Sequence, residues 1–379
     1  MKKLLLGSAA IMTAASASAE HTVNVAILLG LTGPAESLAP AMVAAAESAV
    51  AEVNAAGGVM GHSFAGIVAD STCVDADAAT AAAERLVTSD GVAAIVGALC
   101  SGATGAVLAN VAVPNGVLMI SPSATSPALS TAEDNGLFFR TSPSDARQGA
   151  VLAEETMSRG FTDVAVTYTN NDYGVGLADA FVESFTALGG NVSISLPHED
   201  GKADYNAEVS SLGATGSEAV AVFGYLDGGG RGITEGVIDG DVFEQIIFGE
   251  AMWGDSIMAA LGADLDGVFG LLPGTEESPK DPYAGEAYDA AALTLLSMAA
   301  AGSVSDSAAA ASKVFDVANA PGQKIEAGDL ATALKVLAEG GDIDYVGMTN
   351  VELVGPGEAA GAYMLQEVVD GEITVLAQL

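Results

Sequence analysis

The stretch TVNVAILLGLTGPAESLAPAMVAAAESAVAEVNAAGGVMGHSFAGIVAD, residues 22–70, decides the fold. Its apolar run at 23–29 predicts a strand, and the Ala-rich stretch at 39–55 predicts a helix that ends at Gly57-Gly58. A second strand is predicted at 64–69. A strand, a helix and a strand joined by short turns form a β-α-β unit, which indicates a parallel sheet covered by helices.

The same alternation continues in two series. The first adds a helix at 76–88 and strands at 93–98 and 117–121. The second begins after Asp145 and has helices at 148–159 and 175–188 and strands at 164–168, 192–196, 219–224, 245–249 and 268–272. A long helical region from 283 to 301 is expected to return to the first lobe, and residues 364–379 are typical of a hairpin with Asp370-Gly371 at its tip. We therefore predict an α/β protein with two doubly wound, Rossmann-like parallel-sheet lobes.

The composition excludes several classes of partner. The 379 residues include 49 Asp and Glu against 12 Lys and Arg, a formal net charge of −37. Such a charge repels phosphate backbones and anionic lipid headgroups, so binding to nucleic acid or to a membrane surface is disfavoured. Half of the residues are hydrophobic, which also argues against disorder.

The N-terminus predicts export. Met1-Lys2-Lys3 is followed by an apolar stretch from Leu4 to about Ala15 and by Ala17-Ser18-Ala19 before Glu20. This is the pattern of a signal peptide, residues 1–19, cleaved after Ala19; a buried N-terminal helix is the alternative. No later apolar run approaches the ~20 residues of a membrane span. We expect a mature product in the periplasm without membrane insertion.

Cys73 and Cys100 are the only cysteines. An even count in an oxidising compartment indicates one disulfide, and two buried free thiols are the alternative. The histidines, His21, His62 and His198, are scattered without ligand spacing, so we expect no metal site and no cofactor.

Motifs for catalysis are missing. The sequence has no G-x-S-x-G, no G-x-x-x-x-G-K-[ST] and no H-E-x-x-H. The glycine-rich run from Gly228 to Gly232 lacks the G-x-G-x-x-G spacing and is interpreted as a loop. Ser101 has no nearby histidine that would make it a nucleophile. The sequence therefore favours binding over covalent chemistry.

Two neighbouring strand ends in the first lobe carry hydroxyl groups. The strand at 93–98 is followed by Ser101 at the start of a helix, and the strand at 117–121 by Ser123 and Thr125. Ser101 is a candidate N-cap, and hydroxyl and free backbone N–H groups at such ends can hold a carboxylate. Ordinary helix capping is the alternative.

The corresponding strand ends of the second lobe carry aromatic and acidic residues. Tyr173, Tyr225 and Glu250 each follow a predicted strand. Aromatic faces can close over an apolar or cationic group, and a carboxylate in a water-poor cleft can pair with an ammonium. A solvated glutamate is the alternative for Glu250.

Six short motifs, in their order along the chain, carry a resemblance to a known family: Thr32-Gly33-Pro34, the run 53–61, Leu99-Cys100-Ser101, the run 120–125, Asn171-Asp172-Tyr173-Gly174 and Tyr288-Asp289-Ala290. Together they resemble the periplasmic leucine/isoleucine/valine-binding proteins, the solute receptors of branched-chain amino-acid ABC transporters. The resemblance implies two lobes that close about three crossovers, with the ligand between them. It divides the chain into 20–144 with about 274–349, and 145–273 with about 350–379.

The resemblance also implies roles for single residues. Ser101 and Thr125 match positions that hold the ligand carboxylate. Ser123 matches a position whose backbone carbonyl contributes to binding the amino group, and Glu250 matches the acid that binds the ammonium. Tyr173 and Tyr225 match pocket aromatics, Asp145 an acid near the first crossover, and Cys73 and Cys100 a disulfide pair.

Three departures from the family concern specificity. Leu38 stands where relatives often have Tyr, which enlarges or dries the side-chain subsite. Trp253 is expected either to form a pocket wall or to pack in the core. Asp227 either favours a polar or basic ligand group or is a solvated loop acid.

We therefore expect a monomeric solute receptor that binds a free amino acid and delivers it to a membrane ABC permease, without being an enzyme. A receptor for amides, urea-like compounds or aromatic acids is the first alternative. An extracytoplasmic enzyme acting on amino-acid derivatives is the second.

Overall fold

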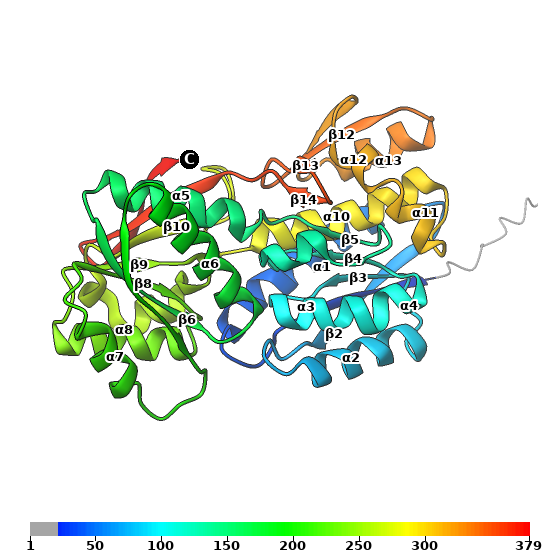
Figure 1. Ribbon diagram of the computed structural model, residues 1–379. Coiled ribbons are helices and arrows are strands. Elements are labelled where there is room, and N and C mark those ends of the chain that lie inside the picture. Colours follow the sequence, from blue (N-terminus) through cyan, green and yellow to red (C-terminus); the bar gives the residue numbers. More distant parts are fainter. Residues whose placement is uncertain (1–21) are drawn as a thin grey trace, which may run out of the picture.

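The structure is a computed structural model, and it describes residues 22–379. It has two lobes, each built on a seven-stranded sheet with helices on its faces (Figure 1). The predicted α/β fold with two doubly wound lobes is confirmed. The predicted signal peptide and its cleavage after Ala19 lie outside the described residues, as does His21.

The first sheet has the strand order β13-β14-β5-β4-β3-β1-β2. Its strands are β1 Thr22–Leu29, β2 Ser63–Asp70, β3 Ala94–Gly97, β4 Leu118–Ser121, β5 Phe138–Arg140, β13 Leu353–Val354 and β14 Glu358–Ala359. Its helices are α1 Ala39–Ala55, α2 Ala76–Thr88, α3 Ser101–Val107, α4 Val113–Asn115 and α10 Ala284–Ala301, with a single turn η1 at Glu36–Leu38. A small attachment consists of α11 Ser307–Ala311, α12 Val314–Ala318, α13 Leu330–Ala338 and the pair β11 Gln323–Glu326 and β12 Ile343–Gly347.

The second sheet has the order β16-β15-β10-β9-β8-β6-β7. Its strands are β6 Asp163–Thr169, β7 Asn191–His198, β8 Ala219–Phe223, β9 Gln245–Phe248, β10 Phe269–Pro273, β15 Tyr363–Val369 and β16 Glu372–Gln378. Its helices are α5 Asp145–Ser158, α6 Asp172–Ala187, α7 Asn206–Gly213, α8 Gly229–Gly240 and α9 Asp255–Leu261, with a turn η4 at Glu250–Met252. Residues 229–232, predicted to be a loop, are instead the first turn of α8.

The two sheets repeat one topology. The five parallel strands β1 to β5 lie in the order β2-β1-β3-β4-β5, and β6 to β10 lie in the order β7-β6-β8-β9-β10. In such a sheet the order reverses beside the first strand, and ligands bind beyond the carboxyl ends of the strands at that point. Each lobe therefore offers an equivalent edge for a ligand.

Local sequence explains the unit at 22–70. Both faces of β1 are buried, Ile27 on one and Leu28 on the other, because helices cover both sides of the sheet. Pro40 stands in the first turn of α1, where a missing N–H costs nothing. The helix ends before Gly58, which has a φ of 73° and approaches His62 so closely that a side chain would collide with its carbonyl.

Cys73 and Cys100 form a disulfide, with their Cα atoms 5.0 Å apart. The bond joins the loop after β2 to the residue that precedes α3. The predicted disulfide is confirmed, and it braces the loops that follow two strands of the first sheet.

The chain returns to the first lobe after β10. Helix α10 packs along α1 of the first lobe, the lobe to which this region was expected to return (Figure 1). Strand β14 pairs with β5 in the first sheet, whereas β15 pairs with β10 in the second. Residues 353–359, assigned in the prediction to the second lobe, therefore complete the first sheet. The predicted terminal hairpin is confirmed as β15 and β16, with Asp370-Gly371 between them.

Candidate ligand-binding site

A small cavity lies between the lobes at the carboxyl ends of their parallel strands. Its volume is about 20 Å³, room for roughly one water molecule. The residues around it come from both lobes: Ala35, Leu38, Leu99, Cys100, Ser101, Ser123, Tyr173, Tyr225, Glu250, Ala251 and Tyr283. The lobes are therefore closed upon each other in this conformation.

Glu250 is the centre of the polar contacts. It begins the turn η4 directly after β9 and is buried. Gln148 Nε2 donates to its Oε2 at 2.6 Å, the Tyr173 hydroxyl donates to the same oxygen at 3.2 Å, and Thr125 Oγ1 donates to Oε1 at 3.2 Å. The Thr125 contact crosses between the lobes. Three donors hold the carboxylate in place, which suits a group that binds a cation.

A second buried acid lies beside Glu250. The Asp145 N–H donates to Thr125 O at 2.9 Å, and within the described residues neither Asp145 carboxylate oxygen has a hydrogen-bond partner. Burial, and then the neighbouring Glu250 charge, raise the pKa of Asp145 well above its usual value. Burial likewise raises the pKa of Glu250 to about 7. Burial and mutual repulsion therefore both disfavour the doubly ionised state of this pair.

Three tyrosines form the aromatic wall of the cavity. The rings of Tyr173 and Tyr225 lie 5.2 Å apart at 33° to each other, and Tyr283 joins them from the segment before α10. Asn171 caps α6 by accepting from the Tyr173 and Gly174 N–H groups, and its Nδ2 donates to the Tyr225 hydroxyl at 3.4 Å. Asn171 thus fixes Tyr225 and the start of the helix that carries Tyr173.

The first lobe contributes hydroxyl and backbone groups. The prediction that Ser101 is an N-cap is wrong. Cys100 takes the capping position, and Ser101 is the first residue of α3. Ser101 Oγ accepts from Ser126 N at 3.1 Å, and a hydroxyl that accepts one bond can still donate its proton. Ser123 Oγ donates to Leu99 O at 2.9 Å. On this side of the cavity the Ser101 hydroxyl can therefore donate to an anion, whereas the Ser123 proton is already committed to Leu99 O.

The other predicted site residues have mixed positions. Leu38 lines the cavity as an apolar residue in the turn η1. Thr125 does not line the cavity, although its hydroxyl donates to Glu250. Trp253 is buried against Phe248, with ring centroids 5.4 Å apart, and is absent from the cavity lining. Asp227 is also absent from the cavity lining; its carboxylate instead accepts from Ser37 N of the first lobe.

Sequence reasoning missed Gln148 and Tyr283. The sequence predicts only that Gln148 begins a helix, whereas in the structure it is fully buried and makes the shortest contact to Glu250. Tyr283 stands in the sequence only at the start of a predicted helical region, and in the structure it precedes α10. Tyr283 lines the cavity, and Gln148 holds Glu250 without lining it. Both positions depend on how α10 packs on α1 and α5 on α6, which no local sequence motif predicts.

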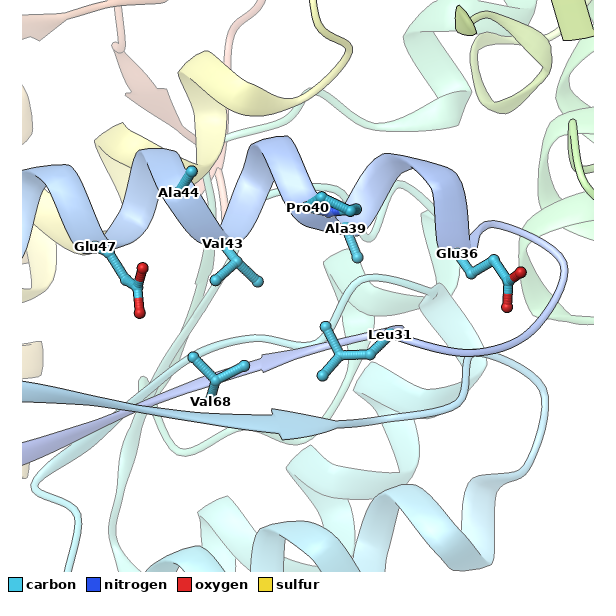
Figure 2. A pocket seen from close by; sticks show the side chains of 8 residues that line it. All are labelled: Leu31, Glu36, Ala39, Pro40, Val43, Ala44, Glu47 and Val68. Carbon is cyan, nitrogen blue, oxygen red and sulfur yellow. The ribbon is translucent and has the colours of Figure 1, made fainter. Parts of the chain in front are cut away.

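An open groove of about 350 Å³ lies elsewhere, between α1 and the edge of the first sheet (Figure 2). Apolar side chains such as Leu31, Val43 and Val68 line it, with Glu36 and Glu47 along its length. The groove faces solvent and contains none of the strand-end residues described above. Within residues 22–379, no cluster of three potential metal ligands occurs and no helix is long and apolar enough to cross a membrane.

Comparison with known proteins gives a consistent result. Residues 22–334 match the family described as periplasmic binding protein. The chemotactic signal transduction system substrate-binding protein BasB of Halobacterium salinarum is 30% identical over 94% of this chain and 89% of its own. The Leu/Ile/Val-binding protein homolog 3 of Brucella melitensis is 31% identical over 83% of this chain and 89% of its own.

Solved structures share the fold at lower identity. The leucine-binding protein LivK of Thermotoga maritima superposes with a TM-score of 0.80 at 20% identity, covering 94% of this chain and 98% of that one. A solute-binding protein of Rhodopseudomonas palustris in complex with p-hydroxybenzoic acid has a TM-score of 0.77 at 17% identity, covering 94% and 97%.

Proposed function

This chain belongs to the type I periplasmic binding protein family, and we propose that it is a solute receptor that encloses a free amino acid between its two lobes. The observation that carries the proposal is the polarity of the cavity. Glu250, held by three donors, lies on one side and the Ser101 hydroxyl on the other. A zwitterion has the matching arrangement, with its ammonium toward Glu250 and its carboxylate toward Ser101 and the first turn of α3.

Binding requires a change of conformation. An amino acid is larger than the cavity of about 20 Å³, so the lobes must separate for it to enter and then close less tightly around it. Leu38 and the three tyrosines provide the surface for an apolar side chain. Thr125 donates to Glu250 in the closed form, so we place its hydroxyl with the ammonium end of the ligand instead of the carboxylate end.

The membrane partner completes the proposal. One relative is named as part of a chemotactic system and others as amino-acid-binding proteins, so the partner is a permease or a chemoreceptor that recognises the closed form. Location in the periplasm after signal removal, a monomeric state and the lack of enzymatic activity belong to the same proposal.

Aromatic acids are the second candidate ligand class, together with amides and urea-like compounds. The convergence of Tyr173, Tyr225 and Tyr283 favours an aromatic ring, and a structural neighbour was solved with p-hydroxybenzoic acid. A benzoate would leave Glu250 without a cation, however. This arrangement favours amino acids over aromatic acids.

Thermal-shift screening with matched ligands tests the proposal. The set contains free amino acids and three matched compounds. L-leucine carries both charges, L-leucinamide lacks the negative charge, and 4-methylpentanoate lacks the positive charge. We expect a free amino acid to raise the melting temperature, because ligand at 100 times its Kd stabilises the native state by about 2.7 kcal/mol. The amide and the acid should give smaller shifts. Shifts with 4-hydroxybenzoate but with no amino acid would select the second class.

A further inference from the structure

Three consecutive residues of the turn η1 face three different parts of the molecule. Glu36 lies along the open groove beside α1 (Figure 2), and Leu38 lines the ligand cavity. Ser37, between them, contacts the second lobe. The turn follows β1 and precedes α1, so it joins the ligand cavity to the outer surface of the first lobe.

The contact across the lobes centres on Asp227. Ser37 N donates to Asp227 Oδ2 at 2.9 Å, and Asp227 N donates to Pro34 O at 3.0 Å. Ser256 Oγ, in the second lobe, donates to Asp227 Oδ1 at 2.5 Å, and the Ser37 and Ser256 hydroxyls are 3.2 Å apart. The carboxylate is thus oriented from its own lobe and accepts from the other. Hydrogen bonds to an ionised acceptor are stronger than neutral ones.

The backbone on both sides is shaped for this approach. Gly228 follows Asp227, and a side chain added to it would collide with Pro34 and with Asp200. A larger residue at position 228 would therefore separate the segments that hold the contact. Asp227 is half-buried and does not line the ligand cavity, so its contacts do not depend on a ligand.

We propose that Asp227 is a latch between the lobes: a positioning residue that favours the closed form without touching the ligand. This inference rests on the proposed function only for its purpose, since closure itself can be measured without ligand. The latch slows ligand release and leaves ligand preference to the cavity. It also ties the position of Leu38 to lobe closure, because Ser37 and Leu38 belong to the same turn.

Distance measurements on the ligand-free protein test the latch. Spin labels on cysteines introduced at Ser89 and Ser211, both exposed and in different lobes, report the separation of α2 and α7 with the native disulfide intact. We expect the Asp227→Ala variant to lower the ratio of closed to open molecules about tenfold, since the bond from Ser37 N to the carboxylate is lost and Ser256 Oγ, which contacts Ser37 Oγ, is no longer held. Asp227→Asn should have an intermediate effect.

Asp239→Ala is the matched control, because Asp239 is exposed on α8 and its removal changes the net charge equally. Melting curves of all variants establish that they are folded, and Asp227→Asn keeps the side-chain volume if the alanine variant unfolds. Distance distributions of both Asp227 variants equal to that of Asp239→Ala would overturn the latch. With an amino acid found by screening, the dissociation rate should rise about tenfold in Asp227→Ala while the order of preferred ligands stays the same. If no amino acid binds, the proposed function fails but the distance measurement still decides the latch.

Discussion

The two sides of the cavity are built on the same sheet topology but carry opposite chemistry. In the first lobe the strand ends after β3 and β4 present the neutral hydroxyls of Ser101 and Ser123. In the second lobe the ends after β8 and β9 present Tyr225 and the acid Glu250. The strand order places both sets at equivalent positions, so topology determines where a ligand contacts the protein and loop residues determine its polarity.

Removal of the charge on the second lobe should have the largest effect. We expect Glu250→Gln to weaken binding of the amino acid about 100-fold, because the ligand ammonium would be buried without its anionic partner. Isothermal titration calorimetry measures the loss. Glu244→Gln, an exposed substitution just before β9, is the control. Equal titration curves for wild type and Glu250→Gln would refute the assignment of the ammonium end.

The corresponding change in the first lobe should cost less. Ser101→Ala removes one hydroxyl while the backbone N–H groups of α3 remain, so we expect affinity to fall about tenfold. The amide of the same amino acid lacks the negative charge and should lose much less. A loss of the same size for acid and amide would mean that Ser101 supports the loop, through its bond to Ser126 N, instead of binding the carboxylate.

The pH dependence of ligand affinity should come from the second-lobe side of the cavity, and its effect should be the smallest. In the free protein burial raises the pKa of Glu250 to about 7, and the ligand ammonium favours the ionised form. Affinity should therefore fall as pH falls through 7, about threefold between pH 7.5 and 6.5, with release of a proton on binding. Calorimetry in buffers of different ionisation enthalpy measures that proton. Binding in Glu250→Gln should lose most of this pH dependence, and an unchanged dependence would point to Asp145 as the group that titrates.

Much of the fold could be predicted from the sequence because its patterns are local. The strand at 23–29 and the helices at 39–55 and 76–88 have clear periodicity and clear ends, and the structure has them within a residue. The glycine-rich composition at 229–232 favours a loop, but α8 approaches residues 224–225 after β8, and the Tyr205 ring, so closely that glycine is needed within the helix. Intrinsic preference for loops was overridden there by tertiary contact.

The candidate site could be predicted only in part. Ser101, Ser123, Tyr173, Tyr225 and Glu250 directly follow strands, so a rule about strand ends finds them. Gln148 lies inside a helix, and its contact to Glu250 depends on how α5 packs against α6 and β10. The sequence leaves Asp227 as either a ligand contact or a solvated acid. In the structure it accepts from Ser37 N, which is 190 residues away in the other lobe. Contacts made by closure of two lobes have no signature within either one.

The pairing of β14 with β5 has a consequence for how the protein is made. The first sheet gains its last two strands only at residues 353–359, after the parallel strands of the second have already been synthesised. During synthesis the first sheet therefore lacks β13 and β14 until residue 359 has been added. A chain that stopped before residue 353 would therefore keep all five parallel strands of that sheet but leave the outer edge of β5 without its neighbour.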